Sequence, residues 1–133
     1  MKSHSQRFMR SWKMKQKIGW VLTGLVAALL LFSAFGKFTA GPEMIAQIEQ
    51  SGIPANLIVT LGILEALVAI LFLIPQTSFV GVILLTGYMG GAIFQHLRLH
   101  ESFLVQTLVP IVAWIGYSLR HYAAIVRLLK NQD

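Results

Sequence analysis

Long apolar segments alternate with short polar ones along the chain. Four segments are apolar almost without interruption, and with their ends they cover residues 18–38, 57–74, 79–96 and 103–119. A helix needs about 17 to 25 residues to cross the hydrocarbon core of a bilayer, so each segment is long enough or nearly so. The pattern predicts an all-α fold, namely an integral membrane antiparallel four-helix bundle.

The connections between the predicted spans differ in length. Residues 75–78 form a tight turn, which makes the second and third spans antiparallel neighbours. Between the first two spans, Pro42 suits the first turn of a helix, an apolar stripe follows, and Gly52 with Pro54 ends it. We predict a short outer amphipathic helix over the mouth of the bundle. The alternative is a simple connector whose apolar side lies in the lipid headgroups.

Basic residues set the predicted orientation, because four spans leave both termini on one side. That side holds nine of the 11 Lys and Arg residues, namely Lys2, Arg7, Arg10, Lys13, Lys15, Lys17, Arg120, Arg127 and Lys130. The positive-inside rule then predicts a multi-pass protein of the cell membrane with both termini in the cytoplasm. We divide the chain into a basic amino-terminal segment (1–17), a transmembrane domain (18–119) and a basic tail (120–133). Basic segments beside a span indicate contact with the lipid bilayer and not with nucleic acid.

Composition excludes several classes of protein. Hydrophobic residues make up 56% of the 133 residues and charged residues 12%, whereas soluble domains are about 25% charged. The chain has no cysteine, which excludes disulfides, thiolate metal sites and dithiol chemistry. Phosphate-loop, HExxH and GxSxG motifs are missing, and His96 and His121 are predicted on opposite sides, so they cannot share a haem. We therefore expect no metal site, no intrinsic cofactor and no self-sufficient enzyme.

One carboxyl does not fit simple membrane packing. Glu65 lies near the middle of the second span, where insertion of Asp, Lys or Arg costs about 2.5 to 3.5 kcal/mol. Lys37 ends the first span, and His96 and Arg98 follow the third, all on the predicted outer side. We predict that these groups line one polar pocket that opens outward, with Glu65 at its floor. The alternatives are a structural carboxyl that fixes helix register and a lysine that snorkels to the interface.

The third span is rich in glycine. Gly87 and Gly91 are four residues apart, so they share a helix face that another helix can approach closely. We assign Gly62, Gly87 and Gly91 to helix packing, which places the third span centrally in the bundle or at the seam of a homodimer. Tyr88 borders this face and is a candidate ligand contact.

Several fragments occur in an order that resembles a known family. They are Ser33–Phe38, Ser51–Pro54, Gly62–Glu65, Gly90–Ala92 and His96–Arg98. Over nearly all its length the chain resembles the DoxX-like family of small four-helix membrane proteins. The resemblance implies a compact antiparallel bundle and singles out Lys37, Glu65, His96 and Arg98. Relatives are linked to quinone-coupled thiosulfate oxidation, redox-stress complexes, redox-enzyme maturation and, in animals, receptor assembly; those that use cysteine chemistry are not a guide here.

Three functions are consistent with these features. The first is a redox-linked subunit of a membrane oxidoreductase that binds a lipophilic, quinone-like ligand. Glu65 would exchange a proton with the ligand or hydrogen-bond to it, the three basic groups would attract an anionic head, and a partner protein would supply electrons. The second is a membrane assembly or scaffold protein without catalysis. The third, a proton-coupled transporter of a lipophilic anion, is disfavoured because the sequence has no inverted repeat.

Overall fold

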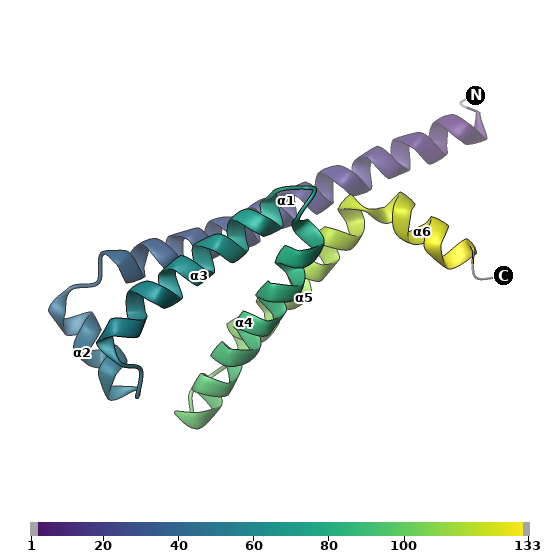
Figure 1. Ribbon diagram of the computed structural model, residues 1–133. Helices are drawn as coiled ribbons and strands as arrows, with labels where there is room; N and C mark the ends of the chain where they lie inside the picture. Colours follow the sequence, from purple (N-terminus) through teal and green to yellow (C-terminus); the bar gives the residue numbers. More distant parts are fainter. Residues whose placement is uncertain (1–2, 132–133) are drawn as a thin grey trace.

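The computed structural model describes residues 3–131, and every regular element in that range is a helix. In chain order these are α1 (His4–Phe38), α2 (Pro42–Gln50), α3 (Ala55–Leu73), α4 (Ser78–Arg98), α5 (Leu104–Arg120) and α6 (Tyr122–Lys130), as shown in Figure 1. The predicted all-α class is therefore confirmed. Lys2, which we counted in the basic amino-terminal segment, lies outside the described residues.

Three of the helices meet the requirements for a membrane span. α1, α3 and α4 are long and apolar enough to cross a bilayer, whereas α5 is apolar but has only 17 residues. α1 is a single helix of 35 residues, so the basic segment is continuous with the first predicted span. At 1.5 Å per residue α1 is about 50 Å long, which exceeds the roughly 30 Å of a hydrocarbon core.

The short helix between the first two long helices lies where the sequence predicts it. α2 begins at Pro42, whose fixed φ suits the first turn, and it ends before Gly52, which has φ of +90°. Backbone bonds from Gly52 N to Glu49 O (2.9 Å) and from Ile53 N to Ile48 O (3.3 Å) close the helix end. None of the residues of α2 is buried, so the helix lies on the surface of the protein.

The four long helices pack in a ring. α1 packs against α3 and α5, and α4 packs against the same two helices. Figure 1 shows that α1 and α3 run side by side, as do α4 and α5, and that the two pairs meet near the turn between α3 and α4. We call this the closed end. Toward the opposite end the pairs diverge, so the helices form a V, and the compact antiparallel four-helix bundle that we predicted is not confirmed.

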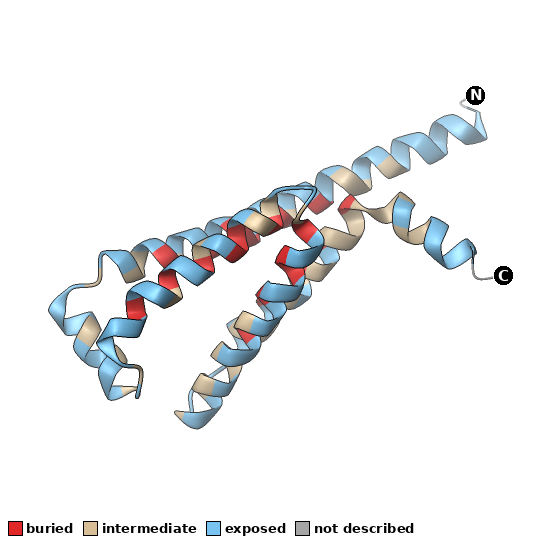
Figure 2. Ribbon diagram, in the orientation of Figure 1, coloured by how far each residue is buried: buried red, intermediate tan, exposed pale blue. Residues whose placement is uncertain are grey.

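The buried core is concentrated between the pairs and near the closed end (Figure 2). Phe72, Val82 and Leu85 are fully buried there. Gly81 allows α4 to contact the backbone of α3, because a Cβ at this position would lie 2.4 Å from Phe72 N. On the other side of the ring, a Cβ at Gly19 would lie 2.7 Å from Arg120 N. The closed end therefore depends on direct contact between helix backbones.

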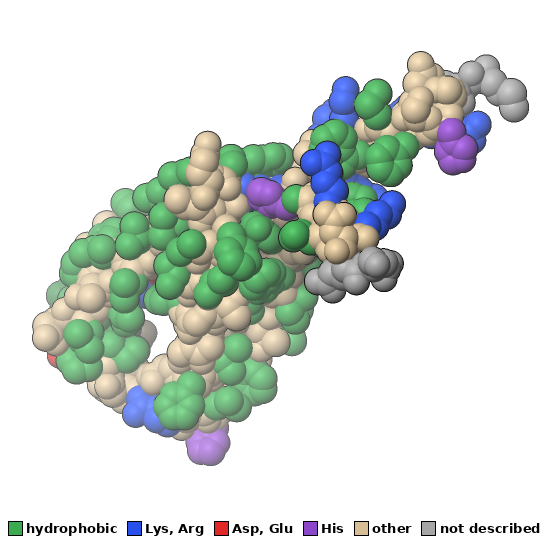
Figure 3. All heavy atoms as spheres, turned by 45° about the vertical axis from the view of Figure 1, so that its right-hand side comes forward, with side chains coloured by type: hydrophobic (Ala, Val, Ile, Leu, Met, Phe, Trp, Pro, Cys, Tyr) green, Lys and Arg blue, Asp and Glu red, His purple; other side chains and the backbone are tan. Residues whose placement is uncertain are grey.

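The outer surfaces of the long helices are apolar. Phe32, Phe35 and Leu104 are 77%, 63% and 63% exposed, and hydrophobic side chains cover much of the surface in Figure 3. Most of the Lys and Arg side chains visible there lie near the two chain ends. A soluble protein rarely exposes such a large contiguous apolar surface, whereas lipid tails cover it favourably.

The carboxy-terminal tail contains a helix that we did not predict. α6 turns away from α5 and exposes Leu128 and Leu129 beside the basic residues Arg127 and Lys130. Lys15 of α1 connects to it, because its Nζ atom lies 3.9 Å from the ring centroid of Tyr122. The basic amino-terminal segment and the tail are thus in contact.

Arg120 differs from the other basic residues of the tail because it is buried. Its Nη1 atom donates to Phe72 O over 3.1 Å, and its guanidinium carbon lies 4.0 Å from the ring centroid of Trp20. Phe72 is in the last turn of α3, where the helix dipole is negative. Arg120 therefore ties α5 to α3 at the closed end and does not act as a free surface charge.

We expect Gly81→Ala to destabilise the protein by about 1–3 kcal/mol, because the added methyl group overlaps the backbone of α3. The matched control is Gly90→Ala on the same helix, where a Cβ meets no atom within 4 Å. Alanine there should be neutral or stabilising, since glycine weakens a helix by about 0.5–1 kcal/mol relative to alanine. Unfolding in detergent measures both effects, and equal stability of the two variants would contradict the proposed backbone contact.

Candidate functional site

A cavity of about 710 Å³ lies between the four long helices. The connection between α2 and α3 also lines it, through residues 52–54. Most of its walls are apolar and come from all four helices, with Leu29, Leu57, Leu61, Met89, Val105 and Val109 among them. The polar groups that share this cavity are therefore surrounded by a medium of low polarity.

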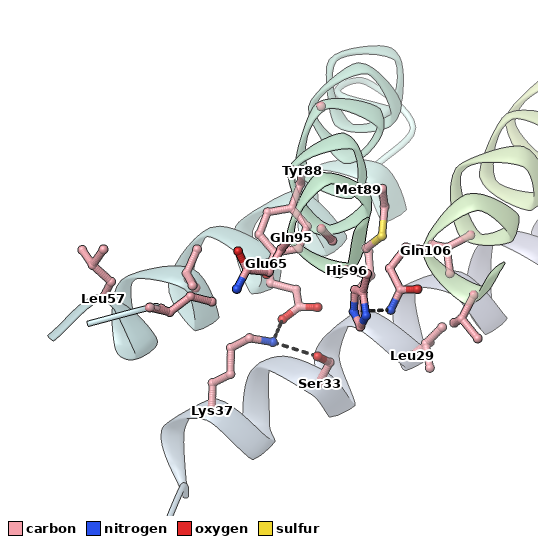
Figure 4. A pocket seen from close by; sticks show the side chains of 18 of the residues that line it. Leu29, Ser33, Lys37, Leu57, Glu65, Tyr88, Met89, Gln95, His96 and Gln106 are labelled. Atoms are coloured by element: carbon pink, nitrogen blue, oxygen red, sulfur yellow. Dashed lines mark hydrogen bonds and ion pairs between the residues drawn. The ribbon is translucent and has the colours of Figure 1, made fainter. Parts of the chain in front are cut away.

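An ion pair between a buried carboxyl and a half-buried lysine lies in this cavity. Lys37 Nζ is 2.6 Å from Glu65 Oε2 and also donates to Ser33 Oγ over 2.9 Å (Figure 4). Glu65 is only 3% exposed. In such surroundings a carboxylate is stable only when a cation and hydrogen-bond donors compensate its charge. Lys37 thus does not act as a free interface lysine, because its charge is used by Glu65.

Local sequence explains how α1 approaches Glu65. Gly62 precedes Glu65 by almost one helical turn, and a Cβ there would lie 2.9 Å from the Phe38 ring and 3.3 Å from Lys37 Cβ. The missing side chain lets the end of α1 pack closely on α3. Gly62 therefore lies at the close contact between α1 and α3, which brings Lys37 within reach of the carboxyl.

Tyr88 of α4 also lines the cavity, and its phenol is close enough to Glu65 to interact with the carboxyl. Figure 4 shows the ring above Glu65, on the side opposite Lys37. The carboxyl therefore lies between an ammonium group and a phenol that come from different helices. A bound molecule could accept a hydrogen bond from Lys37 or exchange a proton with Glu65.

His96 lies at the opposite wall of the cavity. Gln106 Nε2 of α5 lies 2.9 Å from His96 Nε2, and the other ring nitrogen is 3.0 Å from Glu101 Oε2. The imidazole is thus oriented by α5 and by the connection that follows α4.

Arg98 occupies a different position from the one we expected. It does not line the cavity; its guanidinium donates to the Ser51 carbonyl and, over 3.1 Å, to Gln95 Oε1. Gln95 Nε2 donates to the same Ser51 carbonyl over 2.8 Å. Arg98 therefore fastens the end of α4 to the connection between α2 and α3, and its charge lies outside the cavity.

Two of the three predicted packing glycines also differ from expectation. A Cβ at Gly87 or Gly91 would meet no atom of residues 3–131 within 4 Å, so no helix in that range approaches them closely. Both residues line the cavity instead. The spacing of four residues correctly indicates a shared face, but within this chain the close contact of α4 is made by Gly81. A homodimer seam at this face stays a prediction.

Three polar cavity residues were missed as site residues, namely Ser33, Gln95 and Gln106. Ser33 could have been predicted from the sequence, because it precedes Lys37 by four residues and therefore shares its helix face. Gln106 could not, since its contact with His96 depends on how α5 packs beside α4. Within residues 3–131 no three His, Asp or Glu side chains gather as a metal ion would require.

A second polar cluster lies at the closed end. His121 Nε2 is 3.3 Å from Ser78 Oγ, and its ring stacks near Tyr117 with 4.5 Å between centroids. Burial lowers the pKa of His121, and the neighbouring Arg120 guanidinium lowers it further. This histidine is therefore neutral near pH 7, and it joins α5 to the start of α4.

A model of the DoxX-like family matches the chain over residues 21–125. The matched range includes all the residues of the cavity. Neither the search of curated proteins nor that of solved structures gave a match.

We expect Lys37→Met to destabilise the protein by about 3–5 kcal/mol, because it leaves the Glu65 carboxylate buried without its cation. The double variant Lys37→Met/Glu65→Leu should recover most of the loss, since well-packed apolar residues often replace a buried ion pair without penalty. Unfolding of wild type and both variants in detergent tests this. A double variant as unstable as Lys37→Met would show that the unpaired carboxylate is not the cause.

Proposed function

The chain belongs to the DoxX-like family of membrane proteins, and we propose that it binds a small lipophilic ligand in the cavity around Glu65. The observation that carries the proposal is the Lys37–Glu65 pair, whose carboxyl is buried, beside open space. If the pair only fixed helix register, we would expect tight packing around it, because burial of the carboxylate costs free energy and apolar residues in place of an ion pair are often as stable. Ionisable groups inside a membrane domain are typical of functional sites.

The size and lining of the cavity support a lipophilic ligand. A volume of about 710 Å³ falls within the range of about 300–1,000 Å³ that ligand pockets occupy. The apolar walls suit a ring or a chain, and Lys37, Glu65 and Tyr88 form one polar cluster, while His96 and Gln106 form a second at the opposite wall. A ligand with an apolar body and a polar head beside Glu65 matches this lining.

We further propose that the ligand is quinone-like and that the protein is a redox-linked subunit of a membrane oxidoreductase. Lys37 would donate a hydrogen bond to a ligand oxygen, and Glu65 would exchange the proton that accompanies its reduction or oxidation. The sequence has no cysteine, so the chain would take no part in thiol chemistry. Electrons would come from a partner protein in the same membrane.

The proposed topology has four spans, α1, α3, α4 and α5, with both termini in the cytoplasm. The distribution of charge supports it. All four glutamates lie between Glu43 and Glu101, whereas nine of 11 basic residues lie before residue 18 or after residue 119. Under the positive-inside rule the closed end then faces the cytoplasm and the mouth of the cavity faces outward.

A scaffold function is the second candidate, and one observation favours it. Gly87, Gly90 and Gly91 form an exposed face on α4 that no helix of this chain covers closely. Small residues on a membrane helix allow a helix from another protein, or from a second copy, to approach. In that case Glu65 would serve only to hold α1 and α3 in register.

We expect native mass spectrometry of the gently extracted protein to detect a bound small lipophilic molecule that is lost in Glu65→Gln. This substitution keeps the size of the side chain but removes the charge that holds Lys37. Glu49→Gln, on the exposed face of α2, is the matched control and should retain the molecule. A protein that carries no small molecule but keeps the same protein partner in every variant would favour the scaffold function.

The absence of cysteine allows a direct test of topology. Single cysteines at Ser5, Glu43 and Asn131 should differ in their reaction with a membrane-impermeant maleimide on intact cells. We expect rapid labelling of Glu43→Cys, and labelling of Ser5→Cys and Asn131→Cys only after the cells are permeabilised. Labelling of Ser5→Cys and Asn131→Cys from opposite sides would exclude an even number of spans.

A further inference from the structure

The ammonium group that lines the cavity is compensated before any ligand enters. Lys37 Nζ lies 2.6 Å from Glu65 Oε2. Arg98, which we expected to attract an anionic head, is held outside the cavity by Ser51 and Gln95. The cavity therefore offers hydrogen-bond donors and acceptors without a surplus of positive charge.

An anionic head would upset this balance. If it approached Lys37 while Glu65 stayed ionised, two negative charges would share one ammonium group in apolar surroundings. Such an uncompensated buried charge is strongly unfavourable. Uptake of one proton by Glu65 removes the problem, because the acid is neutral and Lys37 becomes free to pair with the anion.

From this geometry we infer that the Lys37–Glu65 pair makes the cavity selective for uncharged polar heads, and that an anionic head enters only together with one proton on Glu65. The inference rests on the proposed function, namely that the cavity holds a lipophilic ligand. An uncharged head needs no such proton. It can accept the remaining N–H of Lys37, since an ammonium group has three donors and only two are used by Ser33 and Glu65.

The proton balance is simple. The proton moves from bulk water to a Glu65 carboxyl oxygen when the anion binds, and it returns to water when the anion leaves. Two other titratable side chains line the cavity besides the pair, Tyr88 and His96 of α4. His96 is the group that could take up the proton in place of Glu65, so the test needs a variant at each position.

The experiment compares two radiolabelled probes with the same ten-carbon tail. Decanol has an uncharged head, whereas the head of decane sulfonate stays anionic at any working pH. Wild-type protein in nanodiscs of zwitterionic lipid is titrated with each probe from pH 5.5 to 8.5. Two variants that fill the cavity from different helices, Leu61→Trp and Ala92→Phe, measure partition into the lipid, which is subtracted.

For wild type we expect specific decanol binding that is independent of pH. The dissociation constant for decane sulfonate should rise tenfold for each pH unit, because one proton binds with each anion. In Glu65→Gln, sulfonate binding should lose its pH dependence and become at least tenfold tighter than wild type at pH 8. In His96→Gln the dissociation constant for decane sulfonate should depend on pH as it does in wild type.

Two results would overturn the inference and leave the proposed function in place. One is cavity-specific binding of decane sulfonate to wild type whose dissociation constant does not change with pH. The other is a pH dependence of this dissociation constant that persists in Glu65→Gln but disappears in His96→Gln. A different result would overturn the proposed function itself. In that case neither Leu61→Trp nor Ala92→Phe would reduce the binding of either probe.

Discussion

Contact between helix backbones at the closed end is the constraint on which the rest of the structure depends. Gly81 brings α4 onto α3, and Gly19 brings α1 onto α5. Nothing comparable happens along α4 toward the other end, where Gly87 and Gly91 meet no neighbouring atom within 4 Å. The two helix pairs therefore meet backbone to backbone at one end and diverge toward the other, where only the side chains of Gln95 and Arg98 reach the Ser51 carbonyl, and the cavity follows from that difference.

The hydrophobic pattern predicts the long helices and α2 well. Helix formation in long apolar runs, and the start and end of α2 at Pro42 and Gly52, depend only on neighbouring residues in the sequence. The pattern also identifies Glu65 and Lys37 as unusual. It cannot show that they pair, since they are 28 residues apart and meet only because Gly62 sets the distance between α1 and α3. We assigned Lys37 a free positive charge for a ligand head, whereas that charge is already compensated within the chain.

Arg98 and the glycines of α4 show a second kind of limit. The position of Arg98 depends on the carbonyl of Ser51, which arrives from a distant connection, so no local pattern could indicate it. Spacing places Gly87 and Gly91 on one face, but only the packed helices decide which face is covered. Arg120 is a similar case, because a basic residue at the end of a span is indistinguishable in sequence from a surface anchor and yet is buried.

α1 is continuous from His4 to Phe38, with its basic turns near one end and Lys37 near the other. An unbroken helix of this length behaves as a stiff rod, so rotation or sliding of its amino-terminal turns is carried to the ammonium group. Displacement of the amino-terminal turns would thus change the contact between Lys37 and Glu65. The basic turns at one end of α1 and the ion pair at its other end are joined without any intervening loop.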